Sequence, residues 1–394
     1  MRISRKHFLA SVGCIVLVSG FSFSYPAAVL AADSAPATTD QKGAAPVQFD
    51  PQLYQTTVDR GVDYLLKKGE ADDGSYSAQI SPAVTAICVD ALLRSGRSPD
   101  DPAIAKSLKY LEGFVQPDGG IYRPDSAIQN YETSISIMCF AEANKDGRYK
   151  DLIKAAENYV KSIQWGADGK TDDSALQYGG AGYGRTKTRP DLSNTSFLLD
   201  ALQAAGAEAN DEAVQRALVF VSRCQNLENK YNTTPFAGKI NDGGFYYTPC
   251  DDGQSPAGKT EDGGLRSYGS MTYAGLKSMI FAGLTPEDER VKAALDWVKK
   301  HYDLSRNPGM DQKGLYYYYH TMAKALSELK SDTFTDDKGV AHAWKAELLQ
   351  ELAKRQQDTG AWVNSANRFD EGDRNLVTSY ALLSLSYCKP AGAK

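Results

Sequence analysis

The stretch IAKSLKYLEGFVQPDGGIYRPDSAIQNYETSISIMCFAEAN, residues 104–144, is the clearest copy of a unit that the rest of the chain varies. Its first segment places apolar residues three or four positions apart with charged residues between them, which predicts a helix with one solvated face. Its second segment, residues 131–143, has no charged residue from 133 to 141, which is typical of a helix covered on most sides. The sequence between them is rich in Asp and Gly and predicts a chain reversal. We therefore expect an outer helix and an inner helix joined by a turn.

Six such helix pairs can be placed along the chain, at about residues 51–96, 102–144, 148–206, 211–283, 286–329 and 342–388. The second helix of every pair has a threonine near its start: Thr85, Thr133, Thr195, Thr272, Thr321 and Thr378. The residue seven positions later is apolar in five of the six pairs. Because positions seven apart share one helix face, we expect the threonine face to pack against the outer helices. We interpret the hydroxyls as bonded to a carbonyl of the preceding turn rather than as catalytic groups.

The turns between the helices also repeat. Five of them contain a Gly-x-aromatic sequence: Gly74/Tyr76, Gly120/Tyr122, Gly244/Tyr246, Gly314/Tyr316 and Gly360/Trp362. The third unit departs from this pattern with Gly-Ala-Gly-Tyr-Gly at 180–184. In the second and sixth units a glutamine, Gln116 or Gln356, precedes the glycine by four positions.

This Gln-x-x-x-Gly-x-aromatic pattern resembles the Gln/Trp repeat of the squalene and oxidosqualene cyclases. Residues 50–390 as a whole look like the terpenoid cyclase and protein prenyltransferase superfamily. The resemblance implies an all-α fold, an α6–α6 toroid (α/α barrel) of six helix-pair repeats. The segment Tyr-Tyr-His-Thr-Met-Ala at 318–323 is similar to the part of the protein farnesyltransferase β subunit whose histidine binds zinc.

The motifs that carry chemistry in this superfamily are missing. The prenyltransferases supply Asp-x-Cys to zinc one unit before the histidine, whereas positions 268–270 here are Tyr-Gly-Ser. His320 alone cannot hold zinc, which needs three or more protein ligands. The Asp-x-Asp-Asp of squalene–hopene cyclases, the Asp-Cys-Thr-Ala-Glu of oxidosqualene cyclases and the Gly-Cys-Gly-Glu-Gln of thioester domains are absent as well. We therefore expect the fold of the superfamily, with no metal site and no cofactor.

The N-terminus predicts export. Basic residues precede an apolar run from Phe8 to Phe23, followed by small residues that suit cleavage, so residues 1–32 are interpreted as a signal peptide. Residues 33–50 have the composition of a disordered linker, and 51–390 form the predicted toroid. After signal removal no membrane span is expected, and the mature protein is predicted to be periplasmic or secreted. A net charge of -5 without a basic tract argues against a nucleic-acid partner.

The inner-helix face opposite the threonines should line the centre of the ring. This face and the tyrosine run at 316–319 supply the predicted ligand-binding residues, which are Tyr131, Ser270, Lys277, Tyr316, Tyr319 and Tyr380. Asp90, Asp200 and Lys277 stand five positions after their threonines. The two aspartates are candidate acid–base residues with a pKa raised by burial, and His320 is a third candidate. Alternatively, Asp200 and Lys277 form an ion pair between neighbouring inner helices, and His320 is structural.

Two long loops, 164–190 and 226–267, both precede an inner helix, so we expect them to lie at the same end of the toroid, around the rim of its central cavity. Cys224 and Cys250 are the candidate disulfide. Cys88, Cys139 and Cys388 are expected to be packed thiols.

Three functions fit these observations. The first is a toroid that binds a small molecule, a peptide or a glycan in its centre. The second is a transferase or cyclase that acts on an isoprenoid-like substrate. The third is a polysaccharide lyase or hydrolase, with Glu132, Asp191 or Asp373 as rim carboxylates.

Overall fold

The computed structural model describes residues 47–184 and 189–389. The predicted signal peptide and most of the predicted linker lie outside these residues. Helices dominate the described chain, and the one sheet within it is the short antiparallel pair β1 (Phe334–Thr335) and β2 (Ala341–His342). The minor elements are a π-helical turn at Leu65–Gly69, the short helix α8 (Ala237–Ile240) and a 3₁₀ turn at Arg368–Asp370.

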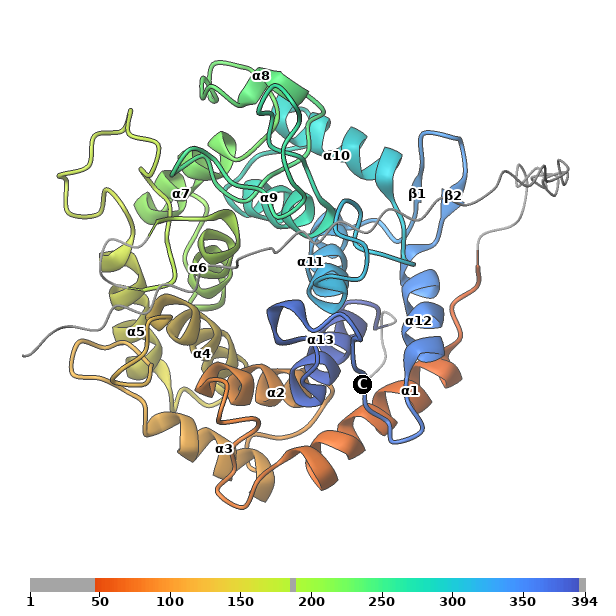
Figure 1. Cartoon of the computed structure of the whole chain (residues 1–394). Helices are drawn as coiled ribbons and strands as arrows, with labels where there is room; N and C mark the ends of the chain where they lie inside the picture. The colour runs from red at the N-terminus through yellow and green to blue at the C-terminus, as the bar shows by residue number, and fades with distance from the viewer. Residues whose placement is uncertain (1–46, 185–188, 390–394) are drawn as a thin grey trace, which may run out of the picture. The chain divides into compact units, whose positions relative to one another are not determined.

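Six helices of the described chain form an inner ring (Figure 1). In order around the ring they are α2 (Pro82–Arg94), α4 (Gln129–Ala143), α6 (Leu192–Ala204), α9 (Gly269–Phe281), α11 (Leu315–Glu328) and α13 (Arg374–Ser386). Neighbours in this order pack against each other, and α13 packs against α2, which closes the ring. The predicted all-α toroid is therefore confirmed.

An outer layer of helices surrounds the inner ring (Figure 1). Its members are α1 (Pro51–Tyr64), α3 (Pro102–Glu112), α5 (Lys150–Ile163), α7 (Glu212–Arg223), α10 (Glu289–His301) and α12 (Trp344–Arg355). Inner helices contact the outer helix that follows them in sequence, as α2 contacts α3 and α4 contacts α5. Burial follows the predicted difference in composition, because nearly every residue of α2 is buried whereas α3 buries one face.

The repeated threonines face the connecting turns rather than the centre. The Thr85 hydroxyl accepts a hydrogen bond from the backbone N–H of Tyr76 at 2.9 Å, and Thr378 accepts one from Trp362 at 3.1 Å. The same contact occurs at Thr133, Thr195 and Thr272. Thr321 differs, because its hydroxyl donates to backbone carbonyls within its own helix. The other five hydroxyls therefore hold the turns against the inner helices.

In five of the six units a turn glycine comes close to the backbone of the next outer helix around the ring. At Gly360 the backbone φ is +89°, and a Cβ added there would lie 2.3 Å from the carbonyl oxygen of Arg60 in α1. The side-chain amide of Gln356 donates to the carbonyls of Gly360 at 2.9 Å and of Thr57 in α1 at 3.0 Å. These contacts join the last turn of the chain to its first helix.

The same glutamine contact occurs in the third and fourth units, where the Gln-x-x-x-Gly pattern is absent from the sequence. Gln164 donates to the carbonyls of Gly179 and of Ala213 in α7, at 2.8 and 2.9 Å. Gln225 likewise donates to Gly243 and to Arg290 in α10. In both units a long loop separates the glutamine from its glycine, so the four-residue spacing of Gln356 and Gly360 is lost.

We predict that Gly360→Ala destabilises the protein more than Gly96→Ala. Both glycines have φ near +90°, so both changes strain the backbone. Only at Gly360 would the new methyl group meet a backbone carbonyl, since nothing lies within 4 Å of the Cβ position at Gly96. Urea unfolding should give a loss of about 1–2 kcal/mol for Gly96→Ala and at least about 2 kcal/mol more for Gly360→Ala. Equal losses would contradict the role of the close approach.

Candidate functional site

A cavity of about 840 Å³ lies at the N-terminal ends of the inner helices. The inner helices contribute apolar and aromatic side chains to its wall, among them Val84, Phe197, Met271 and Leu376. Three of the predicted ligand-binding residues, Tyr131, Ser270 and Tyr380, line it as well. The threonines of the inner helices are not part of this wall.

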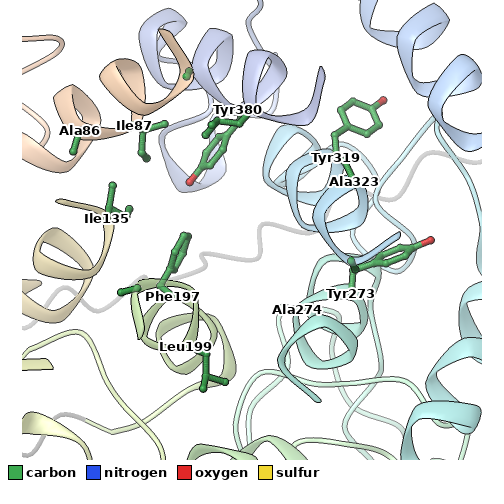
Figure 2. Close-up of a cluster of buried hydrophobic side chains, with 14 of the residues drawn as sticks. Ala86, Ile87, Ile135, Phe197, Leu199, Tyr273, Ala274, Tyr319, Ala323 and Tyr380 are labelled. Atoms are coloured by element: carbon green, nitrogen blue, oxygen red, sulfur yellow. The ribbon is translucent and has the colours of Figure 1, made fainter. Parts of the chain in front are cut away.

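Aromatic rings from four inner helices form the floor of the cavity. The ring of Phe197 stands edge-on to that of Tyr131, with centroids 5.2 Å apart, and stacks with that of Tyr317 at 5.8 Å. Tyr317 in turn packs against Tyr380, with centroids 6.0 Å apart. Figure 2 shows Phe197 and Tyr380 pointing toward the middle of the ring. Such contacts between rings stabilise the floor beyond the burial of their area.

Loops form the rim, and they carry the charged residues of the cavity. The predicted loops 164–190 and 226–267 both reach it, through Tyr183 and through the stretch from Asp251 to Lys259. A third segment, Arg368 to Glu371, completes the rim. Within it Phe369 has φ +66° and leaves 52% of its surface exposed. The wall is therefore apolar where helices build it and charged where loops build it.

Asp200 is held in a buried ion cluster away from the cavity. Its carboxylate lies 2.7 Å from Lys277 Nζ and 2.8 Å from Lys324 Nζ. Burial alone would raise the pKa of Asp200, but the two lysines outweigh it and hold that pKa at about 2. Burial lowers the pKa of Lys277 to about 8. Asp200 is thus a permanent carboxylate that joins α6 to α9 and α11, and neither it nor Lys277 is part of the described cavity wall.

Asp90 and His320 lie beneath the floor. They line a second, water-sized cavity of about 20 Å³ together with Arg94. Phe197 and Tyr380 line both cavities and separate them. Asp90 pairs with Arg94 at 2.9 Å, and burial raises its pKa.

Burial lowers the pKa of His320 to about 3, so its ring is neutral. The Nδ1 atom of His320 has no hydrogen-bond partner among the described residues. The three residues predicted to be catalytic therefore lie below the aromatic floor rather than in the large cavity.

The expectation that Tyr316 and Tyr319 line the cavity is wrong. Both are buried. Tyr319 points away from the centre of the ring (Figure 2), and its hydroxyl donates to the carbonyl of Leu304. The ring of Tyr316 packs against that of Tyr319, with centroids 5.7 Å apart. Tyr317, which lies between them in sequence, lines the cavity instead. Because positions three apart share a helix face, Tyr316 and Tyr319 point the same way, and Tyr317 does not.

The predicted disulfide is also wrong. Cys224 and Cys250 are both free thiols in the structure. Cys224 is fully buried at the end of α7, and Cys250 is fixed by a tight turn in which Thr248 and Gln254 pair. Cys88, Cys139 and Cys388 are buried thiols, as predicted.

The carboxylates proposed for sugar chemistry serve the fold. Asp191 caps α6 by accepting from Asn194 N–H at 2.9 Å, and Asp373 caps α13. Glu132 accepts from the Ser81 hydroxyl at 2.7 Å. Burial raises the pKa of Asp191 to about 6.

Glu371 is the buried acid of the cavity wall, and the sequence reasoning missed it. Its Oε1 accepts hydrogen bonds from the backbone N–H groups of Tyr316 and Tyr317, at 3.0 and 2.9 Å, so it caps α11 from a distant loop. Burial raises the pKa of Glu371 to about 7. One hint of such a residue lies in the sequence at the start of α11. Gly314 has no side chain to cap the helix, so an acceptor for its first N–H groups had to come from elsewhere in the chain.

No three His, Cys, Asp or Glu side chains within residues 47–184 and 189–389 are placed to hold a metal ion. None of the described helices is both long and apolar enough to cross a membrane.

Comparisons with known proteins agree with this architecture. Residues 59–248 match the family model of the squalene-hopene cyclase C-terminal domain. No curated protein matches the chain. The sequence match, which spans just under half of the chain, and the toroid both support a terpenoid cyclase-like fold.

Solved structures show which proteins share the fold. A variant of the type II terpene cyclase MstE from Scytonema superposes with a TM-score of 0.53 at 12% identity, covering 86% of this chain and 96% of the cyclase. A family 76 glycoside hydrolase from a bovine Bacteroides thetaiotaomicron strain superposes with a TM-score of 0.51 at 12% identity, covering 84% of this chain and 77% of the hydrolase. At such identities the likeness concerns the fold alone.

We predict that Asp200→Asn lowers the free energy of unfolding by about 3–5 kcal/mol, because it leaves two lysines buried without their carboxylate. Asp63→Asn is the matched control, since Asp63 pairs with Lys67 on the surface with 60% of its side chain exposed, and it should cost less than about 1 kcal/mol. Chemical unfolding measures both. A small effect of Asp200→Asn would show that the cluster is not a structural requirement.

We also predict that Glu371→Gln changes how stability depends on pH. The pKa of Glu371 is higher in the folded protein than the 4.5 of a free side chain. Its contribution to stability is therefore complete below about pH 4.5 and is lost as pH rises through about 7. Glutamine keeps one oxygen that can accept from the N–H groups of Tyr316 and Tyr317, and it does not ionise. It loses the hydrogen bond that Oε2 accepts from Asn364, but this loss is the same at both pH values. Relative to wild type, the variant should gain about 2–3 kcal/mol on going from pH 5 to pH 8.

Urea unfolding at the two pH values measures this gain for Glu371→Gln. The exposed Glu261, changed to Gln in the same way, should show no comparable gain. If the difference in unfolding free energy between Glu371→Gln and wild type is the same at both pH values, the assigned pKa is contradicted.

Proposed function

We propose that the protein is an exported binding protein that holds an elongated amphiphilic molecule in its cavity. The apolar part of the ligand packs against the aromatic floor, and its polar end lies at the charged rim. Export is inferred from the signal-like layout of residues 1–32. The proposal assigns no reaction to the protein.

The observation that carries this proposal is the separation of polarity within one cavity. Side chains from the inner helices, such as Ile128, Phe197 and Met271, make the deep wall apolar. The charged side chains Asp251, Lys259 and Arg368 belong to the rim loops. Burying apolar ligand surface contributes roughly 25 cal/mol per Å², and an apolar chain gains this only in the deep part. A polar head group stays solvated at the rim.

The lining argues against a glycoside hydrolase. Most such enzymes use two carboxyl groups on either side of the bond that breaks. Here Asp191 and Asp373 are helix caps, and Glu132 is fully buried and accepts hydrogen bonds from its neighbours. None of the three is free to act on a sugar.

An isoprenoid cyclase is the second candidate, and Glu371 is the observation that favours it. Acid-initiated cyclisation needs a protonated acid beside the bound chain. Glu371 lines the cavity, is buried, and has a pKa raised by burial to about 7. Its oxygens, however, accept hydrogen bonds from Tyr316, Tyr317 and Asn364, which suits a cap. Incubation with geranylgeraniol and product analysis separates the two functions, because a binding protein returns the polyene unchanged.

We predict that Val84→Trp abolishes ligand binding. Val84 lines the cavity and is 3% exposed, so a tryptophan there occupies ligand space. Val115→Trp is the matched control, because Val115 is 41% exposed outside the cavity. Calorimetric titration with farnesol should show binding to wild type and to Val115→Trp, and at least a tenfold weaker affinity for Val84→Trp.

A second variant, Ser270→Phe, fills the cavity from α9. It provides an independent test of ligand binding if Val84→Trp does not fold. Cooperative thermal unfolding checks that each variant is folded. Maltotriose is titrated in parallel as a glycan. Binding of maltotriose without binding of farnesol would overturn the proposal of an amphiphilic ligand.

A further inference from the structure

We infer that the cavity selects ligands that carry a neutral oxygen acceptor, such as a carbonyl or an ether oxygen, at the end that is buried deepest. This inference rests on the proposed function and adds a ligand class to it. It concerns a pair of tyrosine hydroxyls, those of Tyr131 and Tyr380, in the floor of the cavity.

The two tyrosines reach each other across the ring. Tyr131 belongs to α4 and Tyr380 to α13, and α2 lies between these two helices in the ring. Their hydroxyl oxygens are 3.5 Å apart. A usual O–H···O hydrogen bond is about 2.5–3.0 Å long, so each hydroxyl satisfies the other poorly.

Counting protons leaves one donor unused. A tyrosine hydroxyl carries one proton and can also accept. Two hydroxyls that bond to each other use only one of their two protons, and neither Tyr131 nor Tyr380 has another side-chain hydrogen bond within the described residues. The second O–H group therefore has no protein acceptor. Both tyrosines line the cavity, so a ligand that displaces solvent there must offer this O–H group an acceptor or leave it unpaired at a cost of about 1–3 kcal/mol.

The unused group remains a neutral donor at physiological pH. Burial raises the pKa of Tyr131 to about 12 and raises that of Tyr380 as well. The surrounding floor is apolar, with Phe197 edge-on to Tyr131. No lysine or arginine belongs to the floor, because the cationic residues of the described cavity wall, Lys259 and Arg368, come from rim loops. An anionic group would lose its hydration there without compensation, whereas a neutral oxygen would not.

Tyr317 provides an internal comparison. It belongs to the same floor, but its hydroxyl lies 3.1 Å from Ser193 Oγ and also interacts with Ser196. Its proton therefore has an acceptor within the protein. Removing this hydroxyl should not affect the recognition of a ligand oxygen.

The test compares two C15 probes, the hydrocarbon farnesene and the aldehyde farnesal, by titration against the folded protein. Wild type should bind farnesal about three- to tenfold more tightly, as one hydrogen bond predicts. Tyr131→Phe and Tyr380→Phe each remove one proton and the bond between the pair, so each variant still has one free donor and should keep the preference. The double variant Tyr131→Phe/Tyr380→Phe should lose it. Tyr317→Phe is the control and should keep it.

The infrared carbonyl stretch of bound farnesal gives a second measurement. It should lie at lower frequency in wild type and in both single variants than in the double variant. A preference that survives in the double variant, or an unshifted carbonyl in wild type, would overturn the inference and leave the proposed function intact. Failure of wild type to bind either probe would overturn the proposed function, and the inference with it.

Discussion

The structure depends on the close approach of the turns to the backbone of the next outer helix, which occurs in every unit but the fifth. The same contact recurs at five glycines with positive φ, where an added Cβ would lie within 3 Å of that backbone: Gly74, Gly119, Gly179, Gly243 and Gly360. A side chain at these positions would push the turn away, so glycine is required by space as well as by conformation. The contact of Gly360 with α1 joins the end of the array to its beginning. A closed ring with an enclosed centre results, rather than an open superhelix.

This arrangement divides the inner helices into two faces with different duties. The outward face is needed for the fold, because hydroxyls such as those of Thr85 and Thr378 accept hydrogen bonds from the backbone of the turns. The inward face makes no such contacts with the turns, although its buried charges, such as Asp200, join neighbouring inner helices. Here that face carries aromatic rings above and charged residues below, with Phe197 and Tyr380 as the boundary. The fold is shared with a cyclase and a hydrolase, and the fold alone does not decide what the centre does.

Periodicity was enough to predict the helix pairs and the direction in which most inner residues point, because both follow from positions within a single helix. The closure of the pairs into a toroid was predicted from the resemblance to the cyclases and prenyltransferases. Periodicity placed Tyr131, Ser270 and Tyr380 in the cavity wall. Periodicity failed for Tyr316 and Tyr319, because α11 begins at Gly314, which has no capping side chain of its own, and the rotation of the helix could not be fixed from its first turn. It could not find Glu371, whose partners are 54 and 55 residues away in sequence. Gln164 and Gln225 escaped notice because loops separate them from their glycines. Contacts made by loops depend on the finished fold.

The distribution of charge explains why this centre suits binding better than acid or base chemistry. Each buried charge beneath the floor has an opposite partner, as Asp200 has Lys277 and Lys324, and Asp90 has Arg94. Such pairs are stable in a medium of low polarity, but a carboxylate held by two lysines is a poor proton donor and a poor base. In the floor itself polarity is supplied by tyrosine hydroxyls, which remain neutral and bring no buried charge. A wall of this kind can orient an oxygen of a bound molecule at small cost, because neither partner has to give up the hydration of an ion.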